Sequence, residues 1–131
     1  MIVLDTHIWI WWLNGTTGKL TDRWMNSIRN ASRVAISAIS CFEVAWLNHH
    51  NRIELPVELS QWFEKSTVGS GVEILPLTPE IAEVAVTLPE HHSDPQDRLI
   101  MVTAIAHRCK LISADSKFEL YDELEDLRIP R

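Results

Sequence analysis

The sequence is poor in features that mark several classes of protein. It has two cysteines, Cys41 and Cys109, too few for a disulfide framework or a zinc-binding pair. No apolar run reaches the roughly 18 residues that a transmembrane helix needs. The start, Met1 to Asp5, lacks the basic segment of a signal peptide. We therefore expect a cytoplasmic protein with no membrane partner.

Basic side chains are also scarce. Twelve Lys and Arg residues oppose eighteen Asp and Glu residues, which gives a net charge of −6 at pH 7. Proteins that coat a nucleic acid duplex bind through clustered Lys and Arg side chains, so this class is excluded. Part of the acid excess lies at the end of the chain, where residues 119–131 hold five acids and two basic residues.

The chain contains no internal repeat, no low-complexity stretch and no linker rich in glycine and serine. It has 131 residues, 46% of them hydrophobic. This length is sufficient for the core of one domain and too short for two. We therefore expect a single domain over residues 1–131.

Short apolar runs alternate with segments of helical periodicity along the whole chain. The expected strands are residues 2–4, 34–37, 72–75 and 111–113, and the expected helices are residues 6–13, 22–30, 40–50, 57–67, 79–88 and 97–107. This alternation predicts the α/β class, with a three-layer α/β/α sandwich around a short parallel sheet of about four to five strands. Strands this short and apolar are typical of sheet interiors.

Four carboxylates fall where such a fold forms its ligand sites, outside the carboxyl ends of the strands. Asp5 follows the first expected strand and Asp115 follows the last. Glu43 and Asp97 fall in the first turns of two expected helices. Carboxylates brought together raise one another's pKa, and a hard divalent cation relieves this repulsion. Because Mg²⁺ and Mn²⁺ prefer carboxylate oxygens, the residues predict a metal site.

Each of the four acids also has a structural interpretation. Asp5 could cap the helix that follows it, and Glu43 could form a capping box with Ser40. Asp97 could be a first-turn acid that favours the helix dipole, and Asp115 could be a turn residue. The coincidence of all four at one edge of the sheet favours a shared metal site over four separate structural roles.

Four blocks of sequence, in the same order, resemble the PIN-domain ribonucleases of the VapC-like toxin group in type II toxin–antitoxin systems. The third block contains the most specific motif, H-x-D-P-x-D-R, and the four together are Leu4–Leu13, Ile36–Ala45, His92–Ile100 and Leu111–Phe118. Matched by position, the acidic site of the family falls on Asp5, Glu43, Asp97 and Asp115. The chain departs from the family pattern at three positions. Family members frequently have Lys where this chain has Leu47, and they have Trp before the Glu where this chain has Phe42. Thr is commoner in the family at the position of Ser113.

The resemblance implies an endoribonuclease that hydrolyses RNA phosphodiesters with Mg²⁺ or Mn²⁺, the toxin of a toxin–antitoxin pair. It also implies a cognate antitoxin and a homodimer as partners. Asp5 and Asp97 are expected to be the central metal ligands, and Asp115 is expected to bind directly or through water. Glu43 is expected either to bind metal or to orient or deprotonate the attacking water.

Several neighbouring residues are given supporting roles. Thr6 and Ser113 are expected to hydrogen-bond the ligands, and Asp94, which precedes a proline, is interpreted as a helix cap. His91 and His92 could be catalytic or could bind metal, but a histidine that fixes the turn by a hydrogen bond is the favoured interpretation. Solvated or ion-paired roles are favoured over RNA contact for the basic residues nearest the expected edge, which are Arg33, Arg98 and Lys117.

Six tryptophans are many for a core of this size. We expect most of them in the core and one or two on a partner-binding surface. They are Trp9, Trp11, Trp12, Trp24, Trp46 and Trp62.

Two other functions stay open. A receiver-like phospho-acceptor domain also has acids at strand ends, but it normally has paired acids after the first strand, whereas Thr6 follows Asp5 here. A binding module that keeps the PIN fold without catalysis is the other alternative, and RNA cleavage measured with Mn²⁺ and with a chelator distinguishes it from the nuclease.

Overall fold

The computed structural model describes residues 1–131 and contains one parallel sheet. The strand order is β3-β2-β1-β4. The strands are β1 (Ile2–Leu4), β2 (Val34–Ser37), β3 (Val72–Leu75) and β4 (Lys110–Ile112). The α-helices are α1 (Thr6–Asn14), α2 (Asp22–Asn30), α3 (Ala38–His49), α4 (Leu59–Ser66), α5 (Pro79–Thr87) and α6 (Pro95–His107). Short 3₁₀ helices are η1 (Val68–Ser70), η2 (Ser116–Leu120) and η3 (Asp122–Leu124).

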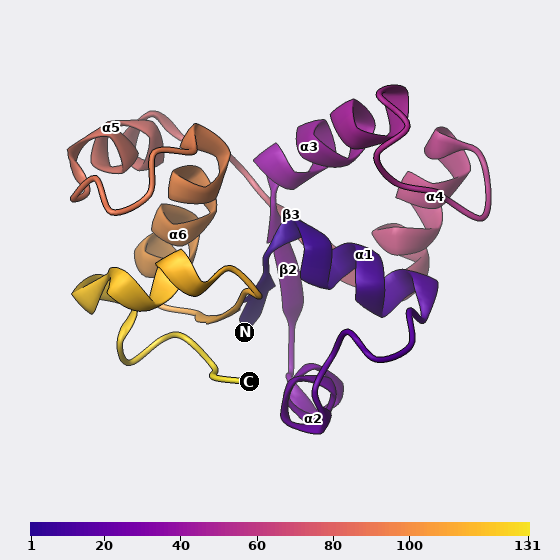
Figure 1. Cartoon of the computed structure of the whole chain (residues 1–131), viewed down its shortest axis with the longest axis horizontal. Helices are drawn as coiled ribbons and strands as arrows, with labels where there is room; N and C mark the ends of the chain where they lie inside the picture. Colours follow the sequence, from indigo (N-terminus) through magenta and orange to yellow (C-terminus); the bar gives the residue numbers. More distant parts are fainter.

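The sheet lies between two layers of helices (Figure 1). Side chains alternate across each strand, so Val3 faces the cluster that contains α5, α6 and the 3₁₀ helices. Its neighbours Ile2 and Leu4 face a second cluster, formed with α1, α2, α3 and α4. Both clusters are apolar, which explains why the strands are continuous hydrophobic runs. The expected three-layer α/β sandwich is confirmed.

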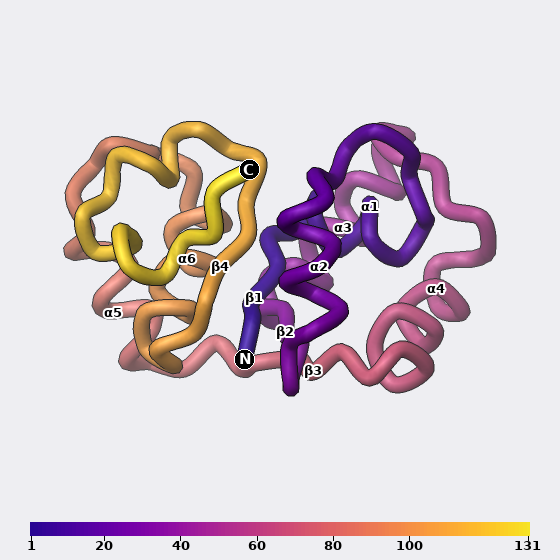
Figure 2. Tube along the Cα trace, turned by 90° about the horizontal axis from the view of Figure 1, so that it is seen from below, coloured from indigo at the N-terminus to yellow at the C-terminus, as the bar shows by residue number.

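The end of the chain extends the sheet. Leu111 in β4 forms a parallel bridge with Arg128, because its N–H donates to the carbonyl of Leu127 and its carbonyl accepts from the N–H of Ile129. In Figure 2 this last segment runs beside β4. The sheet therefore has four regular strands and a short added edge, in agreement with the expected four to five.

Three helices begin at positions different from those expected. Helix α6 begins at Pro95 instead of residue 97, directly after its cap Asp94. Helix α3 begins at Ala38 because the Ser37 hydroxyl caps it by accepting from the N–H of Ile39. Glu43 therefore lies in the second turn, and the expected capping box with Ser40 is wrong. Helix α4 begins at Leu59, two residues after the expected start at residue 57. None of the helices combines the length and apolarity that crossing a bilayer would require.

Half of the tryptophans are buried. Trp9, Trp24 and Trp62 all belong to the cluster on the α1 side of the sheet. Each indole N–H has an acceptor, respectively the Ser66 carbonyl, the Ile129 carbonyl and the Asn14 side chain. The others are half-buried or exposed, and Trp46 is the most exposed at 43%.

Candidate metal centre at the carboxyl edge of the sheet

Asp5 is placed by the register of the sheet. Leu4 is paired with Ile112 in β4, so the residues that follow, Asp5 and Ser113, emerge side by side. The Ser113 hydroxyl donates to Asp5 Oδ2 at 2.6 Å, and the Thr6 N–H donates to Oδ1 at 2.8 Å. Asp5 also caps helix α1. Its capping and site roles therefore coexist in one buried side chain.

Glu43 reaches the same edge from helix α3. The Thr6 hydroxyl lies 2.8 Å from Glu43 Oε1 and 2.9 Å from the Ser40 hydroxyl. Ser40 and Glu43 are three residues apart on α3, so both face α1. The hydroxyls of Thr6 and Ser113 thus contact Glu43 and Asp5, as the supporting roles expected for them require.

Asp97 comes from the opposite helical layer. Asp94 caps helix α6, accepting from the N–H groups of Gln96 and Asp97, and Pro95 occupies the first helical position. Because α6 precedes β4 and runs opposite to the strands, its amino end lies at their carboxyl edge (Figure 1). Asp97 is in the first turn, as expected, and Asp94 has the capping role predicted for it.

Asp115 is joined to this group by hydrogen bonds. Its N–H donates to the Ser113 hydroxyl at 3.1 Å, and its Oδ1 caps η2 by accepting from the Lys117 N–H. Its Oδ2 accepts from His92 Nε2 at 2.9 Å. The same nitrogen lies 2.7 Å from Asp97 Oδ2. Asp97 and Asp115, from α6 and from the end of β4, are therefore brought together across one imidazole.

The carboxylates perturb one another. Burial raises the pKa of Asp97 to about 8, with further contributions from the negative charges of Asp5, Asp94, Glu43 and Asp115 in that order. Desolvation is also the largest cause of the raised pKa of Asp5 and of Glu43. No Lys or Arg forms an ion pair with any of these acids. The basic groups near these acids are imidazoles: His92 contacts Asp97 and Asp115, and His7 partly offsets the rise in the pKa of Asp5 and of Glu43.

The donor set fits a hard divalent cation. Carboxylate oxygens match the preference of Mg²⁺ and Mn²⁺ for oxygen ligands. Hydroxyl and backbone N–H groups hold the carboxylates of Asp5, Glu43 and Asp115 in place. A cation would also relieve the repulsion that raises the pKa of Asp97. Ligand atoms of His92, Asp97 and Asp115 all lie within 4.8 Å of one another. Asp5 and Glu43 lie outside that group, and Asp5 is joined to it through the Ser113 hydroxyl, which donates to Asp5 and accepts from the Asp115 N–H.

His92 has the turn-fixing role that the sequence interpretation favoured, and it also lies among the acids, which that interpretation left as the alternative. It does fix the loop before α6, because its Nδ1 accepts from the Asp94 N–H at 3.4 Å. However, its side chain is also 8% exposed and contacts two of the site carboxylates. The signal available in the sequence was its place at the head of the H-x-D-P-x-D-R block, five residues before Asp97.

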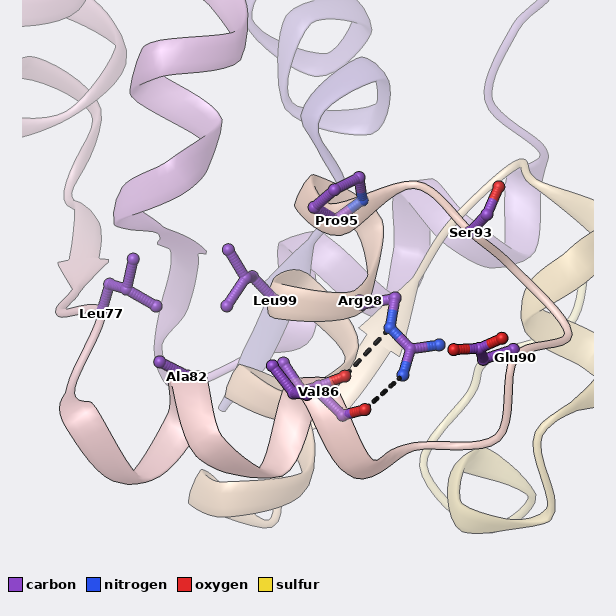
Figure 3. Close-up of a pocket in the computed structure, with 9 residues that line it drawn as sticks. Leu77, Ala82, Val86, Glu90, Ser93, Pro95, Arg98 and Leu99 are labelled. Carbon is purple, nitrogen blue, oxygen red and sulfur yellow. Dashed lines mark hydrogen bonds between the residues drawn. The ribbon is translucent and has the colours of Figure 1, made fainter.

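Arg98 has a role different from that expected, whereas Arg33 has the expected ion-paired role but lies away from the acidic edge. Arg98 is buried and ion-pairs with no acid; its guanidinium donates to carbonyls of α5 and of the following loop. Figure 3 shows it pointing toward α5. Arg98 also lines a pocket of about 410 Å³ whose lining includes none of the four site acids. Arg33 precedes β2, at the opposite edge of the sheet, where it pairs with Glu73. Lys117 lies exposed beside Asp115.

A four-stranded parallel sheet with carboxylates gathered at the carboxyl ends of its strands defines a PIN-like α/β protein. A family model described as the PIN domain matches residues 2–124. The chain belongs to the PIN-domain family. This assignment sets aside the receiver-like alternative.

Individual relatives agree with this assignment. The chain is 35% identical over 117 residues to Ribonuclease VapC22 of Mycobacterium tuberculosis, and the match covers 88% of each chain. Its fold is similar to that in the crystal structure of VapBC2 from Rickettsia felis bound to a promoter DNA fragment, with TM-score 0.66, 22% identity and 98% of each chain covered. It is also similar to a toxin–antitoxin complex from Klebsiella pneumoniae, with TM-score 0.67, 21% identity and coverage of 99% and 97%.

Proposed function

We propose that the protein is a divalent-metal-dependent endoribonuclease that acts as the toxin of a toxin–antitoxin pair. The observation that carries the proposal is the gathering of Asp5, Glu43, Asp97 and Asp115 at one sheet edge with no Lys or Arg paired to them. The 35% identity to a protein named as a ribonuclease supports the same chemistry.

The proposed reaction is hydrolysis of an RNA phosphodiester, in which a water oxygen bonds to phosphorus and the bond to the leaving ribose oxygen breaks. A bound Mg²⁺ or Mn²⁺ would offset the phosphate charge and lower the pKa of the attacking water. Asp5 and Asp97 would hold the cation, with Asp115 binding it directly or through water.

Glu43 has a distinct place in this scheme. Burial raises the pKa of its carboxyl group, and one of its oxygens accepts a hydrogen bond from Thr6. A carboxylate with a raised pKa accepts a proton more readily. Glu43 could therefore orient the attacking water and take its proton, or it could serve as a fourth ligand.

We also propose two protein partners, a cognate antitoxin and a second copy of the chain. The structural relatives named above are toxin–antitoxin assemblies. The exposed aromatic side chains Phe42 (55%) and Trp46 (43%), one helical turn apart on α3, offer apolar surface for a partner. Light scattering of the purified chain, alone and co-expressed with the product of an adjacent small reading frame, tests both partners.

Cleavage of an RNA substrate by the full chain tests the function. Wild type should cleave with Mn²⁺ or Mg²⁺ and stop when EDTA is added. Asp5→Asn and Asp97→Asn should each abolish cleavage with the fold preserved, because each removes one charged ligand. Asp122→Asn, an exposed acid in η3, is the matched control and should cleave like wild type.

Two results would contradict the proposal. Metal-independent cleavage, or full activity in both site variants, would show that the assigned carboxylates do not take part in the reaction. Absence of cleavage in folded, metal-loaded wild type freed of antitoxin would favour the non-catalytic PIN module.

A further inference from the structure

We propose that His92 is a positioning residue of the acidic site, whose Nε2–H group holds the carboxylates of Asp115 and Asp97 in the arrangement that receives the cation. The inference rests on the proposed metal-dependent function. It assigns to His92 a role beyond that of a loop histidine and different from that of a metal ligand.

The first observation is the place of the ring between two acids from different elements. His92 Nε2 lies 2.9 Å from Asp115 Oδ2, with hydrogen-bond geometry, and 2.7 Å from Asp97 Oδ2. The side chain of His92 is 8% exposed, that of Asp97 14% and that of Asp115 33%. The ligand atoms of the two acids lie within 4.8 Å of each other. Their carboxylates repel each other when both are ionised, and a donor between them offsets that repulsion.

The second observation concerns which ring nitrogen carries the proton. The Asp94 N–H points at His92 Nδ1 at 3.4 Å, so Nδ1 is the acceptor. In a neutral imidazole the proton is then on Nε2, the nitrogen that faces the two carboxylates. A histidine that bound metal through Nε2 would carry its proton on Nδ1, where that proton would oppose the Asp94 N–H. The surroundings therefore favour a hydrogen-bond donor over a ligand.

The third observation is that the backbone of His92 is fixed from several sides. Its N–H donates to the Tyr121 hydroxyl at 2.9 Å, and its carbonyl accepts from the Arg98 guanidinium at 3.1 Å. The Tyr121 hydroxyl in turn donates to the Pro89 carbonyl at 2.8 Å. The ring also meets the edge of Phe118 in η2, with ring centroids 6.1 Å apart. A side chain held this firmly can define the position of its acceptors.

Of the two carboxylates, that of Asp115 depends more on the His92 hydrogen bond for its orientation. Asp115 lies just after β4 at the start of a 3₁₀ helix, and it is the most exposed of the three side chains in the cluster. Its Oδ1 is taken by the Lys117 N–H, so the hydrogen bond from His92 to Oδ2 determines the rotation of the carboxylate. Groups that hydrogen-bond a ligating carboxylate typically change metal affinity by about 10–100-fold when they are removed.

Binding of Mn²⁺ to the full chain, measured by isothermal titration calorimetry, tests the inference. His92→Leu should weaken the Mn²⁺ affinity by about 10–100-fold. His92→Gln should retain most of the affinity, because its amide nitrogen can donate near the position of Nε2. His92→Asn, with a side chain too short to reach Asp115, should lose affinity as the Leu variant does and serves if that variant does not fold.

Two further measurements separate positioning from general damage. His107→Leu, at the far end of helix α6 and exposed, is the matched control and should bind Mn²⁺ like wild type. RNA cleavage by His92→Leu should recover toward the wild-type kcat at high Mn²⁺, because the ligands themselves remain.

The outcomes distinguish this inference from the function on which it rests. Wild-type affinity in His92→Leu or His92→Asn overturns the inference and leaves the nuclease intact. Equal losses in the Gln and Leu variants overturn it in favour of direct ligation by the imidazole. Failure of wild type itself to bind Mn²⁺ contradicts the proposed function, and the inference falls with it.

Discussion

At the residue scale, Asp5 and Asp97 each combine a helix-end position with a place in the acidic centre. Asp5 caps α1 and receives the Ser113 hydroxyl; Asp97 sits in the first turn of α6, beside His92. The structural and functional interpretations of these acids are therefore compatible, since helix ends that lie at the carboxyl edge of a sheet also border its ligand site.

Asp97→Asn should stabilise the metal-free protein. Burial and four nearby acids raise the pKa of Asp97 to about 8, so its ionised form is unfavourable in the fold, and a neutral amide removes this cost. We expect a gain of about 1 kcal/mol, which raises Tm by roughly 3–6 °C in EDTA. Added Mn²⁺ should raise the Tm of wild type and leave the variant unchanged.

Thermal unfolding in EDTA and in Mn²⁺, with Asp122→Asn as control, measures both effects. A lower Tm for Asp97→Asn in EDTA would mean that the contact with His92 outweighs the repulsion among the carboxylates.

Ser113→Ala should weaken the site through Asp5. The Ser113 hydroxyl donates to Asp5 Oδ2 and accepts from the Asp115 N–H, so the Ala variant loses both bonds. We expect about a tenfold loss of Mn²⁺ affinity and a loss of about 1–3 kcal/mol in unfolding free energy. Ser113→Thr keeps the hydroxyl and is the control; equal Mn²⁺ affinity in the Ala variant and wild type would rule out this role.

The sequence was sufficient to place the four acids near the carboxyl edge of the sheet, because each lies within three residues of a strand end or inside a helix with a recognisable periodicity. The sequence was not sufficient to predict the hydrogen-bond partners of His92 and Arg98. Their partners are set by tertiary packing: His92 bonds Asp115, 23 residues away, and Arg98 bonds Ala85, 13 residues away. Local pattern does not indicate such contacts.

At the scale of elements, the site depends on how α5 and α6 are joined. Arg98 in α6 donates from Nε to the Ala85 carbonyl at 2.9 Å and from Nη2 to the Leu88 carbonyl at 2.6 Å. Its Nη1 donates to the carbonyls of Pro89 and His92 at 2.9 and 3.1 Å. One side chain thus satisfies the carbonyl end of α5 and anchors the loop that carries His92.

Arg98→Lys should destabilise the fold, although it keeps the positive charge. A lysine has one nitrogen in place of the guanidinium fork, so several buried carbonyls would lose their donor. We expect a loss of about 2–4 kcal/mol in unfolding free energy, measured by urea denaturation. Arg23→Lys, at an exposed position of α2, is the matched control; wild-type stability in Arg98→Lys would contradict the importance of these hydrogen bonds.

The helix boundaries illustrate which element features are readable from sequence. Asp94 followed by Pro95 predicts the start of α6 because cap and proline are both local signals. The start of α3 was misplaced because Ser37 and Ser40 are both plausible caps. Ser37 ends β2 in register with Leu75, and that pairing with β3 selects it as the cap.

At the scale of the whole molecule, two apolar clusters lie on opposite faces of a sheet that both share. The three buried tryptophans lie in one of them, whereas Phe118 and Tyr121 lie in the other. The expectation of a single domain over residues 1–131 implies that the two faces unfold together, because each strand contributes to both.

Urea unfolding followed by two probes tests that expectation. Tryptophan fluorescence reports the α1 side of the sheet, and far-UV circular dichroism reports both layers. We expect coincident transitions with one midpoint. A fluorescence midpoint separated from the dichroism midpoint would show that the two layers unfold independently.

The central claim is that the carboxylates of Asp5, Glu43, Asp97 and Asp115 hold a divalent cation. Anomalous diffraction from crystals grown with Mn²⁺ tests it most directly. We expect an anomalous peak within about 2.5 Å of oxygens of Asp5 and Asp97, and we expect the peak to be lost in Asp97→Asn. A strong peak elsewhere, or none at saturating Mn²⁺, would contradict it.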